Sequence, residues 1–281
     1  MSLNIQAIHD AIDKFVLTNP TESYHVHIEK DEKQRPYLGL SGIGDTCDRK
    51  VWYQWRHALA PKFPSRIHRL FRRGDREEYV FLWLLRGIGV EVFERDEDGK
   101  QFSVNDIEGH VRGNLDGVGK FPKNFGHTEA VLLEFKTASE KKFNEFVKLG
   151  VKKANSKYFG QLQSYMGYME LTGACFMVVN KNTDALFIEF VPFDKYAFRQ
   201  LTGKAEEIVN AQEPPARLSN TPSFWECKFC DFHGICHKKE PAQKLCRTCV
   251  YASPGPDKSW VCSKDQIYGK VCSKWKDITK C

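Results

Sequence analysis

The chain has 281 residues, a formal net charge of +6, and 41% hydrophobic residues, enough for one large domain or one domain with an appendage. No apolar run approaches the ~18 residues of a membrane span, and the start lacks the features of a secretory signal. We therefore expect no membrane association and a cytoplasmic location, in a bacterial or phage-infected cell. Ten cysteines in such a chain indicate metal or cluster ligation rather than disulfides.

The first part of the chain is predicted to be helical. Apolar residues at helical spacing predict a helix over residues 3–17, in an N-terminal helical segment that we place at 1–40. A second predicted helix follows Cys47 and carries Arg49, Trp52 and Tyr53. Residues 65–76 are strongly basic and run into an apolar helix that ends at Gly87 or Gly89, with Glu78 at the edge of its buried face.

Strands are predicted next. Residues 90–94 alternate like a strand, and 101–107 and 110–118 read as the two strands of a hairpin. The second of these carries Asp116 beside Gly117, where the backbone can approach a ligand closely. The run 130–137 predicts another strand, with Glu134 and Lys136 on one face and Phe135 turned into the core. Taken alone, this strand could equally carry two solvated charges.

The second half alternates helices and strands. A helix over 158–171 places Gln161 and Tyr165 one turn apart on one face. Strands over 174–179, with Cys175 as inert core, and over 185–191 precede a helix over 194–211. The order αβββαβ predicts an α/β (α+β) fold, in which helices flank a central mixed β-sheet, with a cysteine-rich C-terminal appendage.

Three carboxylates and a lysine suggest a metal-dependent reaction. Glu78, Asp116 and Glu134 suit Mg²⁺ or Mn²⁺, which can stabilise the attacking and leaving oxygens of phosphodiester hydrolysis. Lys136 can position or activate the attacking water. Basic clusters before and after this set would hold a nucleic-acid backbone. These clusters comprise Arg69, Arg72, Arg73, Lys141, Lys142, Lys152 and Lys153.

These residues carry a family resemblance. Asp116 followed by Glu134-Phe135-Lys136 resembles the signature of the PD-(D/E)xK nuclease superfamily. Residues 74–78, 113–117, 134–137 and 161–165 resemble the successive motifs of its RecB-like branch, although several relatives carry His where this chain has Glu78. The resemblance implies a restriction-endonuclease-like core, a nuclease domain over 41–240, and a metal-dependent DNA exonuclease acting on DNA ends or single strands. Gln161 and Tyr165 would position the backbone or the lysine.

The resemblance extends to four cysteines. Cys227, Cys230 and Cys236 could form a zinc knuckle. In iron–sulfur nucleases of this branch, such as CRISPR adaptation nucleases and AddB-type nucleases, three such cysteines join one far upstream to hold a [4Fe–4S] cluster. The resemblance implies that role for Cys47, and a Cys₄ set suits either Fe–S or Zn.

A second group of cysteines lies in the tail, residues 241–281. Cys246, Cys249, Cys262 and Cys272 predict a small zinc-binding appendage, with Cys281 as an alternative ligand or a free thiol. Nearby lysines with Trp260 and Trp275 would give it a surface suited to nucleic acid.

These features favour DNA hydrolysis in replication, recombination or repair. We expect partner proteins from those processes. The small size of the chain is compatible with a phage-encoded enzyme. Two alternatives stay open. One is a nuclease-like fold that binds DNA without cutting it, and the other is an Fe–S redox sensor that binds DNA.

Overall fold

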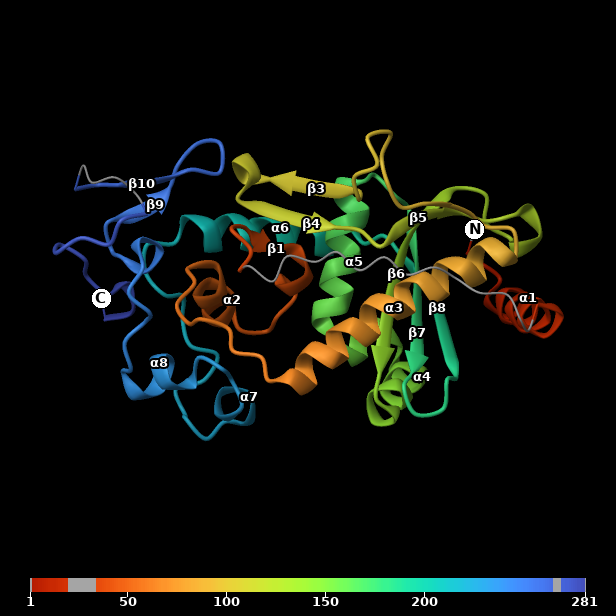
Figure 1. Ribbon diagram of the computed structural model, residues 1–281, viewed down its shortest axis with the longest axis horizontal. Coiled ribbons are helices and arrows are strands. Elements are labelled where there is room, and N and C mark those ends of the chain that lie inside the picture. Colours follow the sequence, from red (N-terminus) through yellow and green to blue (C-terminus); the bar gives the residue numbers. More distant parts are fainter. Residues whose placement is uncertain (1, 20–33, 265–268, 281) are drawn as a thin grey trace. The chain divides into compact units, whose positions relative to one another are not determined.

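The computed structural model describes residues 2–19, 34–264 and 269–280 (Figure 1). The chain divides into two units, and each unit is made of segments far apart in sequence. Unit 1 comprises Met1–Lys33, Phe63–Val104 and Asn114–Phe198, and unit 2 comprises Gln34–Lys62, Asn105–Gly113 and Arg199–Cys281. The domain boundaries expected at residues 40 and 240 stay a prediction.

A five-stranded sheet forms the centre of unit 1. Its strand order is β2 (Glu91–Phe93), β5 (Gly117–Lys120), β6 (Ala130–Ala138), β7 (Gly173–Asn180) and β8 (Leu186–Pro192). Only β6 and β7 are parallel, and the other neighbouring pairs are antiparallel. A parallel pair needs a crossover connection, which α4 (Glu140–Ala154) and α5 (Ser156–Tyr168) supply (Figure 1). The mixed sheet with its helices confirms the predicted fold class.

The hydrophobic core of unit 1 lies between this sheet and two helices, α1 (Ile5–Thr18) and α3 (Ser65–Gly87). Ile8 and Ile12 of α1 and Phe81 of α3 are buried in one cluster with Leu133 and Phe135 of β6. Because side chains alternate along a strand, the even-numbered residues of β6, including Glu134 and Lys136, lie on the opposite face of the sheet. The helices predicted over 3–17 and through the basic segment to Gly87 are confirmed.

The predicted strand over 110–118 is interrupted by a bend in its middle, although its first half pairs with the preceding strand as the predicted hairpin requires. β4 (Val111–Asn114) pairs in a separate three-stranded sheet with β1 (Leu38–Gly39) and β3 (Ser103–Asp106), whereas β5 joins the central sheet. The bend at Leu115 is held by two hydrogen bonds. The Leu115 amide donates to the Phe102 carbonyl at 3.0 Å, and Gln101 Nε2 donates to the Leu115 carbonyl at 2.9 Å.

Besides strands of the three-stranded sheet, unit 2 contains the helix α6 (Lys195–Asn210, which begins in unit 1) and several short elements. The short elements are α2 (Asp48–Trp55), α7 (Trp225–Lys228), α8 (His233–Lys238), β9 (Ala252–Pro254) and β10 (Trp260–Cys262). Single 3₁₀ turns over Leu40–Gly42, Ile107–Gly109, Lys123–Phe125, Cys246–Thr248 and Ile278–Lys280 complete the described secondary structure of the two units. No helix in the described residues is both long enough and apolar enough to cross a bilayer.

Two buried arginines join the tail to the end of α2. Arg56 is fully buried, and its Nη2 donates to the carbonyls of Cys249 at 3.0 Å and Ala252 at 2.9 Å. Arg247 lies over the ring of Trp55 at 4.2 Å and that of Trp260 at 4.6 Å. The half-buried Trp260 ring therefore packs against arginine inside unit 2, and its expected role in a surface for nucleic acid stays a prediction.

Candidate active site

Strand β6 carries a buried charge pair. Glu134 is fully buried, and the ammonium of Lys136, whose side chain is 19% exposed, donates to Glu134 Oε1. Phe135 turns to the opposite face and stacks on Phe81 with ring centroids 5.0 Å apart. The alternation expected along this strand is confirmed, and the alternative of two solvated charges is wrong because Glu134 has no exposed surface.

Asp116 reaches this pair from the bend between β4 and β5. Its Oδ2 accepts a hydrogen bond of 2.9 Å from the Phe135 amide, which places the Asp116 carboxylate beside Glu134. The glycine that follows has a packing role. A Cβ on Gly117 would stand 3.2 Å from the Phe93 carbonyl oxygen and 3.6 Å from Leu133 Cδ1, so neighbouring strands, rather than a ligand, need this position small.

Helix α5 contributes two side chains that contact Glu134 and Lys136. Gln161 is 6% exposed, and its Nε2 donates to Glu134 Oε1 at 2.7 Å. The ring of Tyr158 lies with its centroid 5.1 Å from Lys136 Nζ, a contact that the sequence reasoning missed. Tyr165 is buried one turn beyond Gln161, and its positioning role stays a prediction.

The electrostatics of the set favour a bound cation. Burial, and then the neighbouring charge of Asp116, raise the pKa of Glu134 to about 8, against the lowering effect of Lys136. Burial disfavours the Lys136 ammonium, but the charges of Glu134 and Asp116 outweigh it and raise the pKa of that lysine. Glu134 Oε2 is buried and has no hydrogen-bond partner among the described residues. The set thus holds surplus negative charge and an unused acceptor, which are the requirements of a cation site.

Two adjacent glutamates of α3 behave differently. Glu78 lies near enough for its charge to raise the pKa of Glu134. Glu77 instead stands 3.9 Å from Arg73 Nε, and burial raises its pKa. Of the two, Glu78 therefore belongs with the β6 carboxylate, as the motif resemblance implies. Within the described part of the chain, no group of three or more His, Cys, Asp or Glu side chains is assembled to hold a metal ion as it stands.

The arginines predicted to bind DNA divide into exposed and engaged residues. Arg69 and Arg72 are exposed on α3. Arg73 is half-buried, and its Nη2 donates to the Lys181 carbonyl at 3.1 Å. Arg69 and Arg72 are thus the better placed of the three to meet a phosphate.

The lysines of α4 divide in the same way. Lys141 and Lys153 are exposed. Lys142 Nζ donates to Glu145 Oε2 and to the Ala154 carbonyl, each at 2.7 Å, and Lys152 Nζ lies 3.3 Å from Asp194 Oδ2. Engaged lysines are less available to a backbone phosphate, so Lys141 and Lys153 are the stronger candidates.

Unit 2 brings together the four cysteines that resemble cluster ligands. Cys47 is the N-cap residue of α2, and Cys227 lies in α7. Burial raises the pKa of the Cys227 thiol, and the charges of Cys236 and Cys47 raise it further. Burial and then Cys47 also raise the pKa of the Cys230 thiol. The four thiols are therefore electrostatic neighbours although Cys47 is 180 residues from Cys227 in sequence.

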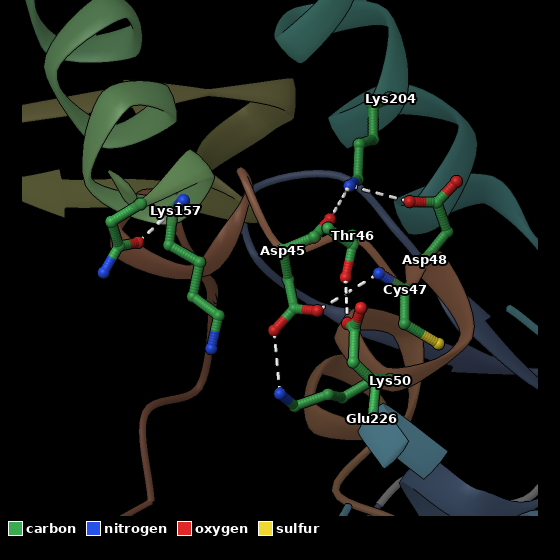
Figure 2. A network of polar contacts seen from close by, with 9 residues as sticks. Asp45, Thr46, Cys47, Asp48, Lys50, Lys157, Lys204 and Glu226 are labelled. Carbon is green, nitrogen blue, oxygen red and sulfur yellow. Dashed lines mark hydrogen bonds and ion pairs between the residues drawn. The ribbon is translucent and has the colours of Figure 1, made fainter. Parts of the chain in front are cut away.

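A polar network holds the loop that carries Cys47 (Figure 2). Asp45 is 6% exposed, and its Oδ1 accepts from the Cys47 amide at 3.1 Å while its Oδ2 accepts from Lys50 Nζ at 2.8 Å. Thr46 Oγ1 donates to Glu226 Oε2 at 2.5 Å, which joins the residue before Cys47 to the residue before Cys227. Lys204 Nζ donates to the Asp45 carbonyl at 2.6 Å.

The second group of cysteines also converges. Cys246, Cys249, Cys262 and Cys272 all line one small cavity of the tail. Cys281, the alternative ligand, lies outside the described residues. Cys175 is fully buried in β7, and burial raises its pKa to about 12, so the prediction that it is inert core is confirmed.

Comparison with models of known protein families finds no match, and neither does comparison with curated proteins. Among solved structures, the chain is similar to SSO0001, with 16% identity and a TM-score of 0.43 over 84% of this chain and 98% of that chain. It is also similar to an alkaline exonuclease (LHK-Exo) from Laribacter hongkongensis, with 13% identity and a TM-score of 0.44 over 62% of this chain and 86% of that one. The structure of LHK-Exo in complex with dAMP gives 12% identity and a TM-score of 0.43, over 62% and 87%. These likenesses are distant, so the activity of the protein has to be inferred from its own residues.

Proposed function

We propose that the chain is a Mg²⁺- or Mn²⁺-dependent deoxyribonuclease that degrades DNA from ends or along single strands. The observation that carries the proposal is Glu134, fully buried beside Asp116 and bonded to Lys136, with one carboxylate oxygen left without a partner among the described residues. A buried carboxylate with an unused acceptor is costly unless a ligand meets it. A divalent cation is the ligand that two or three such carboxylates suit.

Glu78, Asp116 and Glu134 would hold the ion, and their oxygens are the donors that Mg²⁺ and Mn²⁺ prefer. When bound, the ion supplies charge stabilisation to the attacking and leaving oxygens of the phosphodiester. The protein would fix the ligands themselves. The Phe135 amide orients Asp116, and Gln161 orients Glu134.

Lys136 would act as a charged hydrogen-bond donor. Its pKa is raised by the two carboxylates, so the side chain keeps its proton at neutral pH and cannot serve as a general base. An ammonium there can orient the attacking water and offset the negative charge that develops on the phosphate. The ring of Tyr158, which faces Lys136 Nζ, stabilises the ammonium through its π face.

We further propose that Cys47, Cys227, Cys230 and Cys236 hold a [4Fe–4S] cluster with a structural role. Their donor chemistry fits the group, since four thiolates bind such clusters. The cluster would join the start of α2 to α7 and α8 within unit 2. Replacing Cys227 by Ala should abolish the iron content and the absorbance near ~400 nm of anaerobically purified protein. Unchanged iron in that variant would contradict the ligand assignment.

The proposed activity is tested by degradation of end-labelled single- and double-stranded DNA in Mn²⁺ or Mg²⁺. Asp116→Ala and Lys136→Ala should each reduce the cleavage rate by about 100-fold or more. Lys100→Ala is a matched control, because Lys100 forms an exposed pair with Asp98 at 3.1 Å, and it should cut like the parent.

The outcomes of that assay distinguish a nuclease from a protein that binds DNA without cutting it. Cleavage that survives in both site variants would refute the site. DNA binding without cleavage by the parent protein, with either ion, would favour the binding-module alternative.

A further inference from the structure

The second cysteine group forms a site of its own, separate in sequence from the four cluster cysteines. Cys246 and Cys249 lie at the 3₁₀ turn Cys246–Thr248, Cys262 ends β10, and Cys272 lies in the segment after the described gap. These segments meet around a cavity of about 20 Å³ that all four cysteines line. We propose that this cavity is a structural zinc site with these four thiolates as ligands.

The backbone of the tail brings the ligands together without any ion. The Cys249 amide donates to the Cys246 carbonyl at 3.0 Å, and Cys262 pairs with Ala252 across the β9–β10 ladder. Trp275 fixes the last segment, because its ring Nε1 donates to the Leu245 carbonyl at 2.8 Å and its amide donates to the Cys272 carbonyl at 3.2 Å. Zinc would still have to draw the thiols closer, because within the described residues no three such groups stand at metal-binding spacing.

The size of the cavity favours one ion over a cluster. A space of about 20 Å³ accommodates little more than one water-sized particle. A single Zn²⁺ ion, with the four lining thiolates as its ligands, matches a space of this size better than the much larger cube of four irons and four sulfides. The two cysteine groups would thus take different metals, iron in the cluster group and zinc in the tail.

Charge around the cavity also fits. Four thiolates and one Zn²⁺ carry a net charge of −2, which needs compensation in a partly buried site. Lys264, Lys270 and Lys274 line the same cavity and supply positive charge.

The tail has too small a core to hold this arrangement by burial alone. In the described part of residues 241–281, the buried apolar side chains are Ala242, Cys249, Ala252 and Ile278. Segments of about 40 residues with so little apolar burial are usually stabilised by metals or disulfides. All four cysteines are free thiols, so no disulfide among them supports the tail, and a metal would add to the contacts that Arg56 and Arg247 make with it.

The test measures zinc and iron in the full-length protein, purified anaerobically, by mass spectrometry of the metals. The wild type should contain about one zinc per chain, and Cys262→Ser and Cys272→Ser should lose nearly all of it while keeping their iron. Cys175→Ala, at a buried cysteine outside both groups, is the matched control and should retain zinc. Cys281→Ser should retain it as well.

Cobalt substitution keeps the proposal testable if the serine variants fail to fold. Wild-type protein loaded with Co²⁺ should show the intense visible bands of tetrahedral cobalt thiolate, distinct from the brown absorbance of an iron–sulfur cluster. The proposal would be overturned if wild-type protein from zinc-supplemented cells contained no zinc and its cobalt form lacked these bands. It would also be overturned if Cys281→Ser lost the zinc and Cys272→Ser kept it. Neither result bears on DNA cleavage, which is measured separately.

Discussion

The raised pKa of Glu134 predicts that cation binding depends on pH. A carboxyl group with a pKa of about 8 is largely protonated at pH 6, and a divalent cation binds only its deprotonated form. Well below the pKa, each pH unit therefore weakens apparent Mn²⁺ affinity about tenfold, and between pH 8 and pH 6 the affinity falls about 50-fold. An exposed glutamate with its usual pKa of about 4.3 would give no change over this interval.

Titration calorimetry with Mn²⁺ measures this directly, in buffers of different ionisation enthalpy between pH 6 and pH 9. Binding at pH 6 should release about one proton per ion, and binding at pH 9 should release almost none. Glu134→Gln should abolish the release. Glu145→Gln is the control, because Glu145 is exposed and its hydrogen bond with Lys142 lowers its pKa, and it should follow the wild type.

The raised pKa of Glu134 also determines how the stability of the metal-free fold changes with pH. Its pKa is raised in the folded state, so it stabilises the metal-free fold at low pH, and this contribution is lost as pH rises toward about 8. Between pH 5 and pH 8, the melting temperature of the metal-free wild type should therefore fall relative to that of Glu134→Gln. Equal Mn²⁺ affinities at pH 6 and pH 8, or a pH-independent difference between the two proteins, would refute this reasoning.

Three further predictions follow from the contacts. Gln161→Leu should cut at least about tenfold more slowly with little loss of helix content, because it removes a hydrogen bond to a buried carboxylate, and wild-type rates would contradict this. Lys141→Ala combined with Lys153→Ala should reduce the slope of log affinity for DNA against log salt by about 1.8, measured by anisotropy, whereas Lys100→Ala should not change it. Asp45→Asn should weaken the ion pair with Lys50 and lower the iron content at purification, and iron equal to the wild type would show that the loop is held without the charge.

The chemistry of β6 could be predicted because it depends on local rules. The two-residue period of a strand places Glu134 and Lys136 on one face, and it assigns Phe135 to the core without any knowledge of its partner. The long helix α3 and the two strands after α5 follow equally from periodicity. In these elements the spacing of apolar residues along the chain is enough to predict the structure.

The bend at Asp116 could not be predicted in this way. Residues 110–118 read as one extended, glycine-rich strand, and both halves are extended in the structure. What separates them is a hydrogen bond from Gln101, fourteen residues away from Leu115, and pairing in two different sheets. Such non-local bonds leave no periodic trace.

The contact of Tyr158 with Lys136 was missed, and the expected start of its helix was also slightly late. The helix was expected to begin at that residue, but Asn155 caps it, with Oδ1 accepting from the amides of Lys157 at 3.1 Å and Tyr158 at 3.2 Å. The helix therefore starts earlier, and Tyr158 comes three residues before Gln161 on the face toward β6. An asparagine at this spacing was the available signal.

The two faces of β6 have a consequence for how mutations in this protein would be read. The nine residues of that strand serve the core on one side and the charged set on the other, and they share one backbone. A shift of the Phe135 ring against Phe81 would move the amide that holds Asp116. A library screened by loss of cleavage would therefore return apolar positions together with the charged ones, and only a parallel measurement of folding would distinguish damage to the scaffold from damage to the chemistry.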